Sequence, residues 1–490
     1  MTIFRLIMFA ALCWATPPSW AAELSEPEQD ATVPSAPAAD TPIESTPLPS
    51  LPPKPRQQLR ELDRRLSVLE SVVVGRGHGR GVMERGLGWS PEIKERGFAL
   101  YSNDGLFRLH LNGGVQADYH GYPGTHSLND PGTEPSGFVL RRLRPILDFR
   151  IAQYFRGQIM PDLAPRKRSE LFNAFIDWDR FEWARVRVGQ FKPVMSIENQ
   201  QGEFDLVFAE RSLVQNFALR RDFGVQVTGR VLNRAVRYDL GVFNSNNGAV
   251  GSSSVPDTSS DNNKLGMARL MYTPFLLAGP KALRQLDLGV AAMYGGCRES
   301  VCQQPMLTMG QDHTIFQYNG SVTGNGDHTW LLPQMSWFWG RMGMMSTLVH
   351  TWEHKIDRAT GAAAQLQHQA WMVQGELALT DDEPAFNRVT PKRPFDGTWE
   401  SFSRGHWGAW TIGARYSEQT LDADTFRLNF GDATQYARTA KGYSVALNWY
   451  ASREFRFQNM WEHTDFKGAN GTYAAAGKAD MLIFRMTLIY

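Results

Sequence analysis

Arginines recur at every second residue in several short apolar segments of this 490-residue sequence. Side chains two residues apart on an extended strand point the same way, so these guanidinium groups would share one face. A guanidinium is always charged, and its planar fork matches the oxygens of phosphate or carboxylate. A row of such groups would attract anions, and several weak sites suit rapid passage better than one tight site. The candidate anion-binding residues are Arg142, Arg144, Arg150, Arg185, Arg187, Arg220 and Arg230, together with Lys192.

The charge around these residues is uneven. Residues 138–237 contain 18 lysines and arginines and 11 aspartates and glutamates, although the whole chain has a formal net charge of +1. From charge alone two interpretations stay open: an anion-selective surface, or arginines that brace a wall by pairing with nearby acids. Asp148, Asp177, Asp179 and Glu182 lie close enough in sequence to be such partners. The nearly neutral chain implies no nucleic-acid partner.

The sequence contains no pattern for catalysis or for metal binding that we recognise. G-x-S-x-G, H-E-x-x-H and P-loop motifs are absent, and we interpret His350 and His354 in "HTWEH" as wall or loop residues. We therefore expect no catalytic residue, metal or cofactor. Cys297 and Cys302 lie in a turn-like segment without further zinc ligands nearby, so we predict a small loop disulfide in an exported chain.

The N-terminal 96 residues differ in composition from the remainder. Residues 1–21 have one early charge, an apolar run too short to span a bilayer, and small residues before a cleavage site, which predicts a signal peptide. Residues 27–55 contain nine prolines, so 22–55 should be a disordered spacer. Residues 56–74 carry leucines at heptad spacing and predict a short helix, either oligomerising or packed on a neighbour. Residues 75–96 should be a flexible connector.

From residue 97 to 490 apolar and polar residues alternate in runs of about ten, separated by Gly, Asn, Asp and Pro turns. Such runs are typical of a transmembrane β-barrel, with apolar side chains toward lipid and polar ones toward the lumen. A secreted β-sandwich also alternates, but its strands are shorter. We predict an all-β fold, an antiparallel barrel of about 16 strands in the outer membrane. The runs include "FRLHLNGGVQADYH", "RRLRPILDFRIAQYF", "FGVQVTGRV", "WGAWTIGARYSE", "GYSVALNWYAS" and "MLIFRMTLIY".

The stretch that follows the arginine pair 185/187 resembles the phosphate-selective porin O/P family. The family segment R-x-G-x-F-K-P-x-x-S-x-E is matched here, as are its F-x-E-R and R-x-x-G-V elements. "YDLGVFNS" and residues 392–417 match as well, so the resemblance covers about residues 100–490. The matching positions are Arg187, Gly189, Phe191, Lys192, Pro193, Ser196 and Glu198, then Phe208, Glu210 and Arg211, then Arg221, Gly224 and Val225.

The resemblance implies a homotrimer of 16-stranded barrels in the bacterial outer membrane, each with a pore for phosphate or related anions such as pyrophosphate or polyphosphate. It implies that the segment from Lys192 to about Glu210 folds inward and narrows the pore, with Lys192 at the constriction. Small anions and membrane lipid are then the expected partners. The alternatives are a general porin without strong anion preference, a barrel enzyme, or a structural receptor protein.

Overall fold

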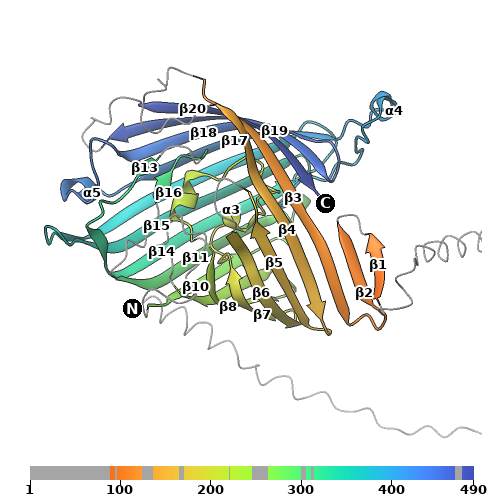
Figure 1. Cartoon of the computed structure of the whole chain (residues 1–490), viewed down its shortest axis with the longest axis horizontal. Coiled ribbons are helices and arrows are strands. Elements are labelled where there is room, and N and C mark those ends of the chain that lie inside the picture. Colours follow the sequence, from red (N-terminus) through yellow and green to blue (C-terminus); the bar gives the residue numbers. More distant parts are fainter. Residues whose placement is uncertain are drawn as a thin grey trace, which may run out of the picture. The chain divides into compact units, whose positions relative to one another are not determined.

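The computed structural model describes residues 89–93, 97–123, 136–164, 170–219, 221–244, 263–298, 305–310, 314–468 and 477–490 (Figure 1). The predicted signal peptide, spacer and heptad helix lie outside these residues, as do Arg220 and Cys302. The chain divides into two units, 1–78 and 79–490, and the described residues all belong to the second. No helix within these ranges is long and apolar enough to cross a membrane.

Sixteen antiparallel strands form a closed barrel, because the last strand pairs with the first strand of the ring. This confirms the predicted fold class and strand number. The wall consists of β3 (Phe107–Gly121), β4 (Gly137–Ile151), β5 (Phe155–Asp162), β6 (Glu170–Phe181), β7 (Ala184–Phe191), β8 (Asp222–Val231), β9 (Val236–Phe243), β10 (Leu265–Tyr272), β11 (Leu286–Arg298), β14 (Val322–Trp339), β15 (Met342–Asp357), β16 (Ala363–Ala378), β17 (Ala409–Thr420), β18 (Ala437–Tyr450), β19 (Phe455–Gly468) and β20 (Lys478–Ile489).

Side chains alternate between the two faces of the wall as the sequence predicts. In β20 the guanidinium of Arg485 is buried inside the barrel, whereas the neighbouring Phe484 and Met486 are exposed on the outside. In β18 the same contrast separates buried Asn448 from outward Leu447. The outward faces therefore carry apolar residues suited to lipid, and the inward faces carry the groups that a solute would meet.

The ring closes at a crowded position. Gly113 and Tyr490 exchange two backbone hydrogen bonds, of 3.0 and 3.1 Å. A Cβ atom added to Gly113 would lie 2.3 Å from the carbonyl oxygen of Arg144, so only glycine fits there. Below this point the edge of β3 pairs instead with β2 (Phe98–Ser102), which forms a hairpin with β1 (Trp89–Ile93). Strand β1 lies within the span 75–96 that the sequence predicts as a connector.

The two ends of the barrel differ in their connections. Short turns at 152–154, 182–183, 340–341 and 451–454 lie at the end that holds Tyr490, and most long loops lie at the other end. Short turns are periplasmic in outer-membrane barrels and long loops are extracellular, which orients this barrel.

The connection 379–408 between β16 and β17 is unusually long for the periplasmic end, and it contains helix α4 (Trp399–Ser403). Its first part lies inside the mouth of the barrel. There Gln201 donates a 2.6 Å hydrogen bond to the carbonyl oxygen of Phe386, and Arg388 lies 3.9 Å from the carboxylate of Asp205.

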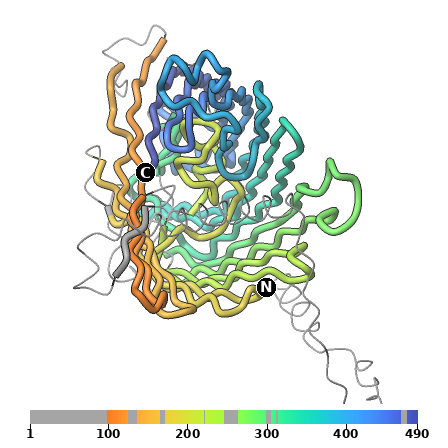
Figure 2. The backbone as a smooth tube through the Cα atoms, turned by 90° about the vertical axis from the view of Figure 1, so that its right-hand side faces the viewer, coloured from red at the N-terminus to blue at the C-terminus, as the bar shows by residue number. Residues whose placement is uncertain are grey.

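The connection between β7 and β8, residues 192–221, folds into the barrel, as the resemblance implies (Figure 2). We call it the inward segment. It contains helix α3 (Ile197–Gln200), capped by the Ser196 hydroxyl at 3.0 Å, and the 3-10 helix η2 (Leu213–Phe217). These short helices contact the inner faces of β14, β15, β16 and β17.

A second loop also lies within the barrel, between β11 and β14. It contains β12 (Met306–Leu307) and β13 (Thr314–Phe316), which pair with each other. Asn216 of the inward segment donates to the Leu307 carbonyl at 2.8 Å and accepts from the Leu307 amide at 3.1 Å, so the two loops hold each other. The remaining short helices are η3 (Lys281–Leu283) and α5 (Asp424–Arg427).

Two parts of the inner wall differ in their chemistry. The inner faces of β10, β11, β14, β15 and β16 contribute apolar side chains that form one buried cluster with the inward segment; we call them the apolar sector. The same faces also carry polar groups, among them the buried ion pair of Glu353 and Lys355 at 3.0 Å. The inner faces of β3 to β8 and of β20 carry most of the predicted arginines; we call them the charged sector. The apolar sector supplies Met267, Met293, Leu332, Met345, Val349 and Met372 to the cluster, and the inward segment supplies Met195, Ile197, Leu213, Val214 and Phe217.

Candidate functional site

The carboxylate of Glu203, in the inward segment, lies among four cations. Arg144 of the wall approaches it at 2.9 Å, and Lys192 and Arg211 each approach at 3.3 Å. Arg221, just before β8, lies at 3.5 Å. The sequence separates these groups by up to 77 residues, and the inward fold of the segment brings them together.

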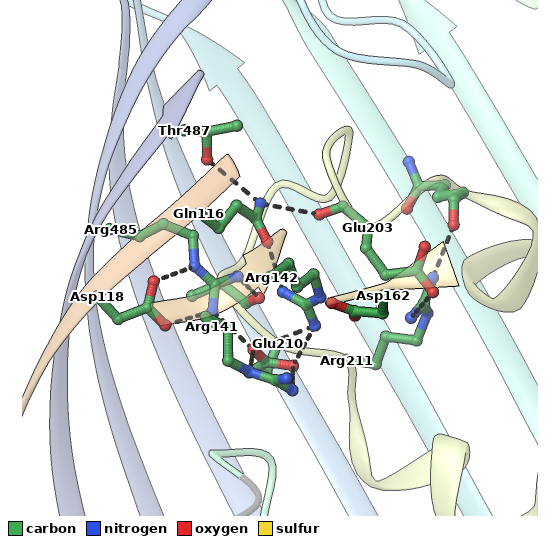
Figure 3. Close-up of polar contacts among 12 residues, drawn as sticks. Gln116, Asp118, Arg141, Arg142, Asp162, Glu203, Glu210, Arg211, Arg485 and Thr487 are labelled. Carbon is green, nitrogen blue, oxygen red and sulfur yellow. Dashed lines mark hydrogen bonds and ion pairs between the residues drawn. The ribbon is translucent and has the colours of Figure 1, made fainter. Parts of the chain in front are cut away.

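Glu210 forms a second centre with three arginines (Figure 3). Arg141 lies at 2.8 Å, Arg142 at 3.0 Å and Arg485 at 2.7 Å. Arg485 also makes an ion pair with Asp118 at 2.6 Å. The segment is thus tied to β4 and to β20, the last strand of the ring, and through Arg485 it is linked to Asp118 of β3, where the barrel closes.

A β-bulge explains why two consecutive arginines reach the same carboxylate. Gln116 of β3 pairs with Arg142, but the next residue, Ala117, pairs with Leu140, so Arg141 is an extra residue in β4. A bulge re-aims the side chain of its extra residue. Here it turns Arg141 into the barrel, whereas strict alternation would direct it outward.

A third carboxylate, Glu198, joins the inward segment to itself and to the far wall. It accepts hydrogen bonds from the amide and hydroxyl of Ser212, at 2.9 and 2.6 Å, and lies 3.3 Å from Arg415 of β17. Glu198, Glu210 and Arg211 belong to the family-like stretch of the sequence. Their contacts show that this stretch anchors the segment.

The two central carboxylates are held in the ionised state. Burial alone would raise the pKa of the Glu203 carboxyl, but its surrounding cations hold the pKa well below its usual value. Burial likewise opposes ionisation of Glu210, and its three arginines lower the pKa of that carboxyl well below the usual value. Opposite charges at this distance favour the charged form.

Cations outnumber carboxylates around the two centres. Seven cationic side chains surround Asp118, Asp162, Glu203 and Glu210. Ion pairing therefore cancels only part of the positive charge. The uncancelled charge makes the electrostatic potential of the lumen more positive. The seven are Arg141, Arg142, Arg144, Lys192, Arg211, Arg221 and Arg485.

The charged sector also contains a pocket of about 300 Å³ toward the periplasmic end. Five arginines and a histidine line it together with two aspartates, so it too carries excess positive charge. Inner faces of β3 to β7 form its walls. The lining residues are Arg108, His110, Asp148, Phe149, Arg150, Arg156, Gly157, Gln158, Phe175, Asp177, Arg185 and Arg187.

These arginines differ in how firmly they are held. Arg187 makes a two-point contact with Asp177, at 2.6 and 2.8 Å, and its guanidinium lies 3.6 Å above the ring of Phe175. Arg150 is exposed, and the Arg185 side chain is 37% exposed and 3.9 Å from Asp177. Arg150 and Arg185 are therefore better placed than Arg187 to meet a solute.

The structure separates the predicted residues into three groups. Arg142, Arg144 and Lys192 belong to the two carboxylate centres, and Arg150, Arg185 and Arg187 belong to the pocket. Arg230 is exposed at the end of β8, and Arg220 lies outside the described residues.

Both interpretations of the arginines find support in these contacts. Asp177 pairs with Arg187, Asp179 with Arg156, and Glu182 with Arg234, which is the bracing arrangement. Asp148 instead accepts hydrogen bonds from Asn112 and Gln158 at 2.7 and 2.9 Å. Some arginines therefore brace the wall through an ion pair with a nearby acid. The others contribute to the excess of positive charge.

Sequence reasoning missed several members of the site. Arg485 lies in an alternating apolar and polar run, as the predicted arginines do, so the same reasoning could have predicted that it points inward. The bulge that turns Arg141 inward has no comparable signal in the sequence. Cys297 is disulfide-bonded, whereas its predicted partner Cys302 is outside the described residues. Among the described residues, no group of three or more His, Cys, Asp and Glu could hold a metal ion.

Solved structures of outer-membrane channels are similar to this barrel in fold. No curated protein matches the sequence. The barrel is similar to the outer-membrane channel DcaP of Acinetobacter baumannii, with a TM-score of 0.50 and 10% identity over 81% of this chain and 100% of that one. An anion-selective porin from Comamonas acidovorans also matches, with a TM-score of 0.45 and 10% identity over 78% of this chain and 100% of that one.

The family model for phosphate-selective porin O and P matches residues 109–490, which is most of the chain and the whole of the barrel after the start of β3. The matched region includes the inward segment, both carboxylate centres and every lining residue of the pocket except Arg108. The protein therefore belongs to the phosphate-selective porin O and P family and is a channel of the bacterial outer membrane.

Proposed function

We propose that this channel passes phosphate or related small anions by diffusion, and that the charged sector sets the preference for anions. The observation that carries the proposal is the excess of cations over carboxylates, both around Glu203 and Glu210 and in the pocket below them. Low-dielectric walls focus such a field inside a lumen and raise the local concentration of ions of opposite sign.

Within this sector we assign the larger role to the arginines of the pocket. Lys192 lies 3.3 Å from Glu203 and donates to the Asn199 carbonyl at 2.9 Å, so its charge is largely engaged in holding the inward segment. Arg150 and Arg185 face the pocket with more exposed guanidinium groups. Such groups can exchange water for phosphate oxygens and release them again, as rapid passage requires.

The test is the double charge reversal Arg150→Glu/Arg185→Glu, measured as the reversal potential in a KCl gradient. A unit charge at about 4 Å in water contributes about 1 kcal/mol. We therefore expect the chloride-to-potassium permeability ratio to fall by at least about fivefold, which corresponds to that energy. Block of the chloride current by added phosphate should weaken in parallel.

The matched control is Arg404→Glu/Arg427→Glu, which makes the same charge change at two exposed positions outside the inner wall. If the pocket variant has the same permeability ratio as the parent protein, the pocket arginines do not set selectivity and only brace the wall. If the parent itself does not prefer anions, the protein is a general porin.

We further propose a homotrimer, on the basis of membership in the family. Chemical cross-linking of the protein in mild detergent should give dimer and trimer bands. A product that stays monomeric across cross-linker concentrations would contradict the assembly, and would leave the proposal on anion passage untouched, because each barrel encloses its own lumen.

A further inference from the structure

The periplasmic connection 379–408 carries an unusual set of exposed aromatic side chains. Trp399 is 80% exposed, Trp407 51% and Phe402 44%. All three lie on or directly beside helix α4, which projects from the periplasmic end of the barrel in Figure 1. We call residues 395–407 the aromatic arm. Exposed rings gathered in one place mark a surface that contacts an apolar partner.

The rings of the arm are ordered with respect to one another. Trp399 stacks on Phe402 with centroids 5.3 Å apart, and Phe402 stacks on Trp407 at 5.6 Å. Helix α4 is capped by the Thr398 hydroxyl, which accepts from the Ser401 amide at 3.1 Å. The arm is therefore a defined element that presents its rings together.

The arm is joined to the lipid-facing side of the barrel. Phe395 packs on Trp449 of β18 with centroids 5.7 Å apart, and the Trp449 indole donates to the Trp407 carbonyl at 2.7 Å. Trp449 points outward, because the adjacent Asn448 is buried inside the barrel. The root of the arm thus lies on the outer surface of the wall.

Trp449 is itself part of a stack along the outer wall. Trp410 lies 5.5 Å from it on one side, and Phe457 lies 5.3 Å away on the other, both measured between ring centroids. Rings at this level of a barrel form the aromatic girdle at the membrane interface. The rings of the arm extend this girdle beyond the end of the strands.

The polar atoms of the arm are compatible with an interfacial position. The Trp407 indole donates to the Phe402 carbonyl at 2.7 Å, so this N–H group needs no water. Glu400 of α4 and Arg404, the residue that follows the helix, pair with each other. The third charged group of the arm, the Asp396 carboxylate, accepts hydrogen bonds from the amide and hydroxyl of Thr398 at 2.9 and 2.6 Å. The helix therefore carries rings and a neutral ion pair, the combination that the boundary between headgroups and acyl chains accepts.

We propose that the aromatic arm lies in the periplasmic interface of the outer membrane, with Trp399 and Phe402 among the lipid headgroups. Its partner is the phospholipid surface itself. The continuity of the arm with the girdle favours lipid over a second copy of the chain or over open periplasm. Glu400 and Arg404 cancel, and Asp396 leaves the arm with one net negative charge, so the arm should enter neutral bilayers more readily than anionic ones. This inference does not depend on which solute the channel passes.

The experiment places a nitroxide spin label on the full-length protein in phosphatidylcholine nanodiscs, through the substitution Trp399→Cys. Collisions with oxygen report lipid, and collisions with a water-soluble nickel chelate report water. Phe484→Cys, on the outward face of β20, gives the lipid reference, and Thr360→Cys, in an exposed extracellular turn, gives the water reference. Cys297 is disulfide-bonded and does not take the label.

We expect the oxygen-to-nickel collision ratio at position 399 to lie near that at Phe484 and well above that at Thr360. A ratio equal to that at Thr360 would overturn the proposal in favour of open periplasm. Low collision rates with both reagents would overturn it in favour of contact between protein copies. Ser403→Cys, on the same helix without loss of a ring, repeats the measurement in case the label at 399 disturbs the stack.

Discussion

The two sectors of the inner wall hold the same inward segment by opposite means. The apolar sector packs methionines, leucine and valine against Met195, Leu213 and Phe217, and it contributes little charge to the contact. The charged sector grips the other side through Glu203 and Glu210, each surrounded by more cations than it can neutralise. One sector fixes the segment through apolar packing, and the other fixes it through ion pairs that leave a residual positive field.

This difference separates stability from selectivity in the molecule. Apolar burial is non-directional and creates no electric field, so changes there should affect how firmly the segment is held. Ion pairs in a partly buried site affect both properties, because the removal of one partner leaves the other charge uncompensated.

Removal of one side chain should lower the free energy of unfolding more in the charged sector than in the apolar sector. Glu210→Ala leaves three arginines without their common carboxylate and should lower the free energy of unfolding by about 3–5 kcal/mol. Urea unfolding of the detergent-solubilised protein, followed by tryptophan fluorescence, measures this change. Glu418→Ala is the control, since Glu418 lies on the outer wall 3.8 Å from Lys441. Equal losses in both variants would show that Glu210 has no special role.

The apolar sector should lose stability without a change in selectivity. Leu213→Ala removes a fully buried side chain and should cost about 2–3 kcal/mol, because the surrounding side chains can relax only partly. The chloride-to-potassium permeability ratio should stay at the parental value. Leu447→Ala, on the lipid-facing side of β18, provides the control for unfolding. A marked change of permeability ratio in Leu213→Ala would show that the apolar sector also sets selectivity.

Lys192 tests whether a cation already engaged in an ion pair still acts on solutes. Lys192→Met removes one of four cations around Glu203, and the three remaining arginines keep this carboxylate compensated. We expect the permeability ratio to change by less than about twofold, equivalent to about 0.4 kcal/mol. Arg185→Met, measured alongside, should change the ratio more. A larger change in Lys192→Met than in Arg185→Met would show that Lys192 has the main role in selectivity, as the family resemblance implies.

Mild acid should have the smallest effect. The pKa values of Glu203 and Glu210 are lowered in the folded protein, so their contribution to stability is complete above the usual glutamate pKa of about 4.3. It is lost only as the pH falls through the lowered folded values. Between pH 7 and pH 5 the two carboxylates should therefore contribute no change in unfolding free energy. A decrease that Glu210→Gln abolishes would show that Glu210 is protonated in this range.

Much of the fold follows from local patterns in the sequence. The alternation in residues 107–121 and 478–489 predicts which side chains of β3 and β20 face the lumen, because a strand has a fixed period of two. It also predicts the inward position of Arg142 and Arg144. These properties depend on neighbours in the chain and not on distant contacts.

The carboxylate centres depend on contacts that local patterns do not contain. Arg485 meets Asp118 across 367 positions in the sequence, and this meeting exists only because the ring closes between β20 and β3. The inward turn of Arg141 depends on a register shift of one residue. The apolar sector breaks the polar-inside rule for such barrels, because two loops fill that side of the lumen and exclude water from Met345 and Met372.

The connection 379–408 touches both the inward segment and the outside of the barrel. Near its start, Phe386 and Arg388 contact Gln201 and Asp205, and farther on, Phe395 packs on the lipid-facing Trp449. One covalent stretch of backbone therefore links the inward segment to the outer surface of the wall. Bilayers of different thickness shift the level of their interfaces relative to an embedded protein. With the aromatic arm in the interface as proposed, a thinner or thicker membrane would load this connection, and the load would reach Gln201 and Asp205 of the inward segment.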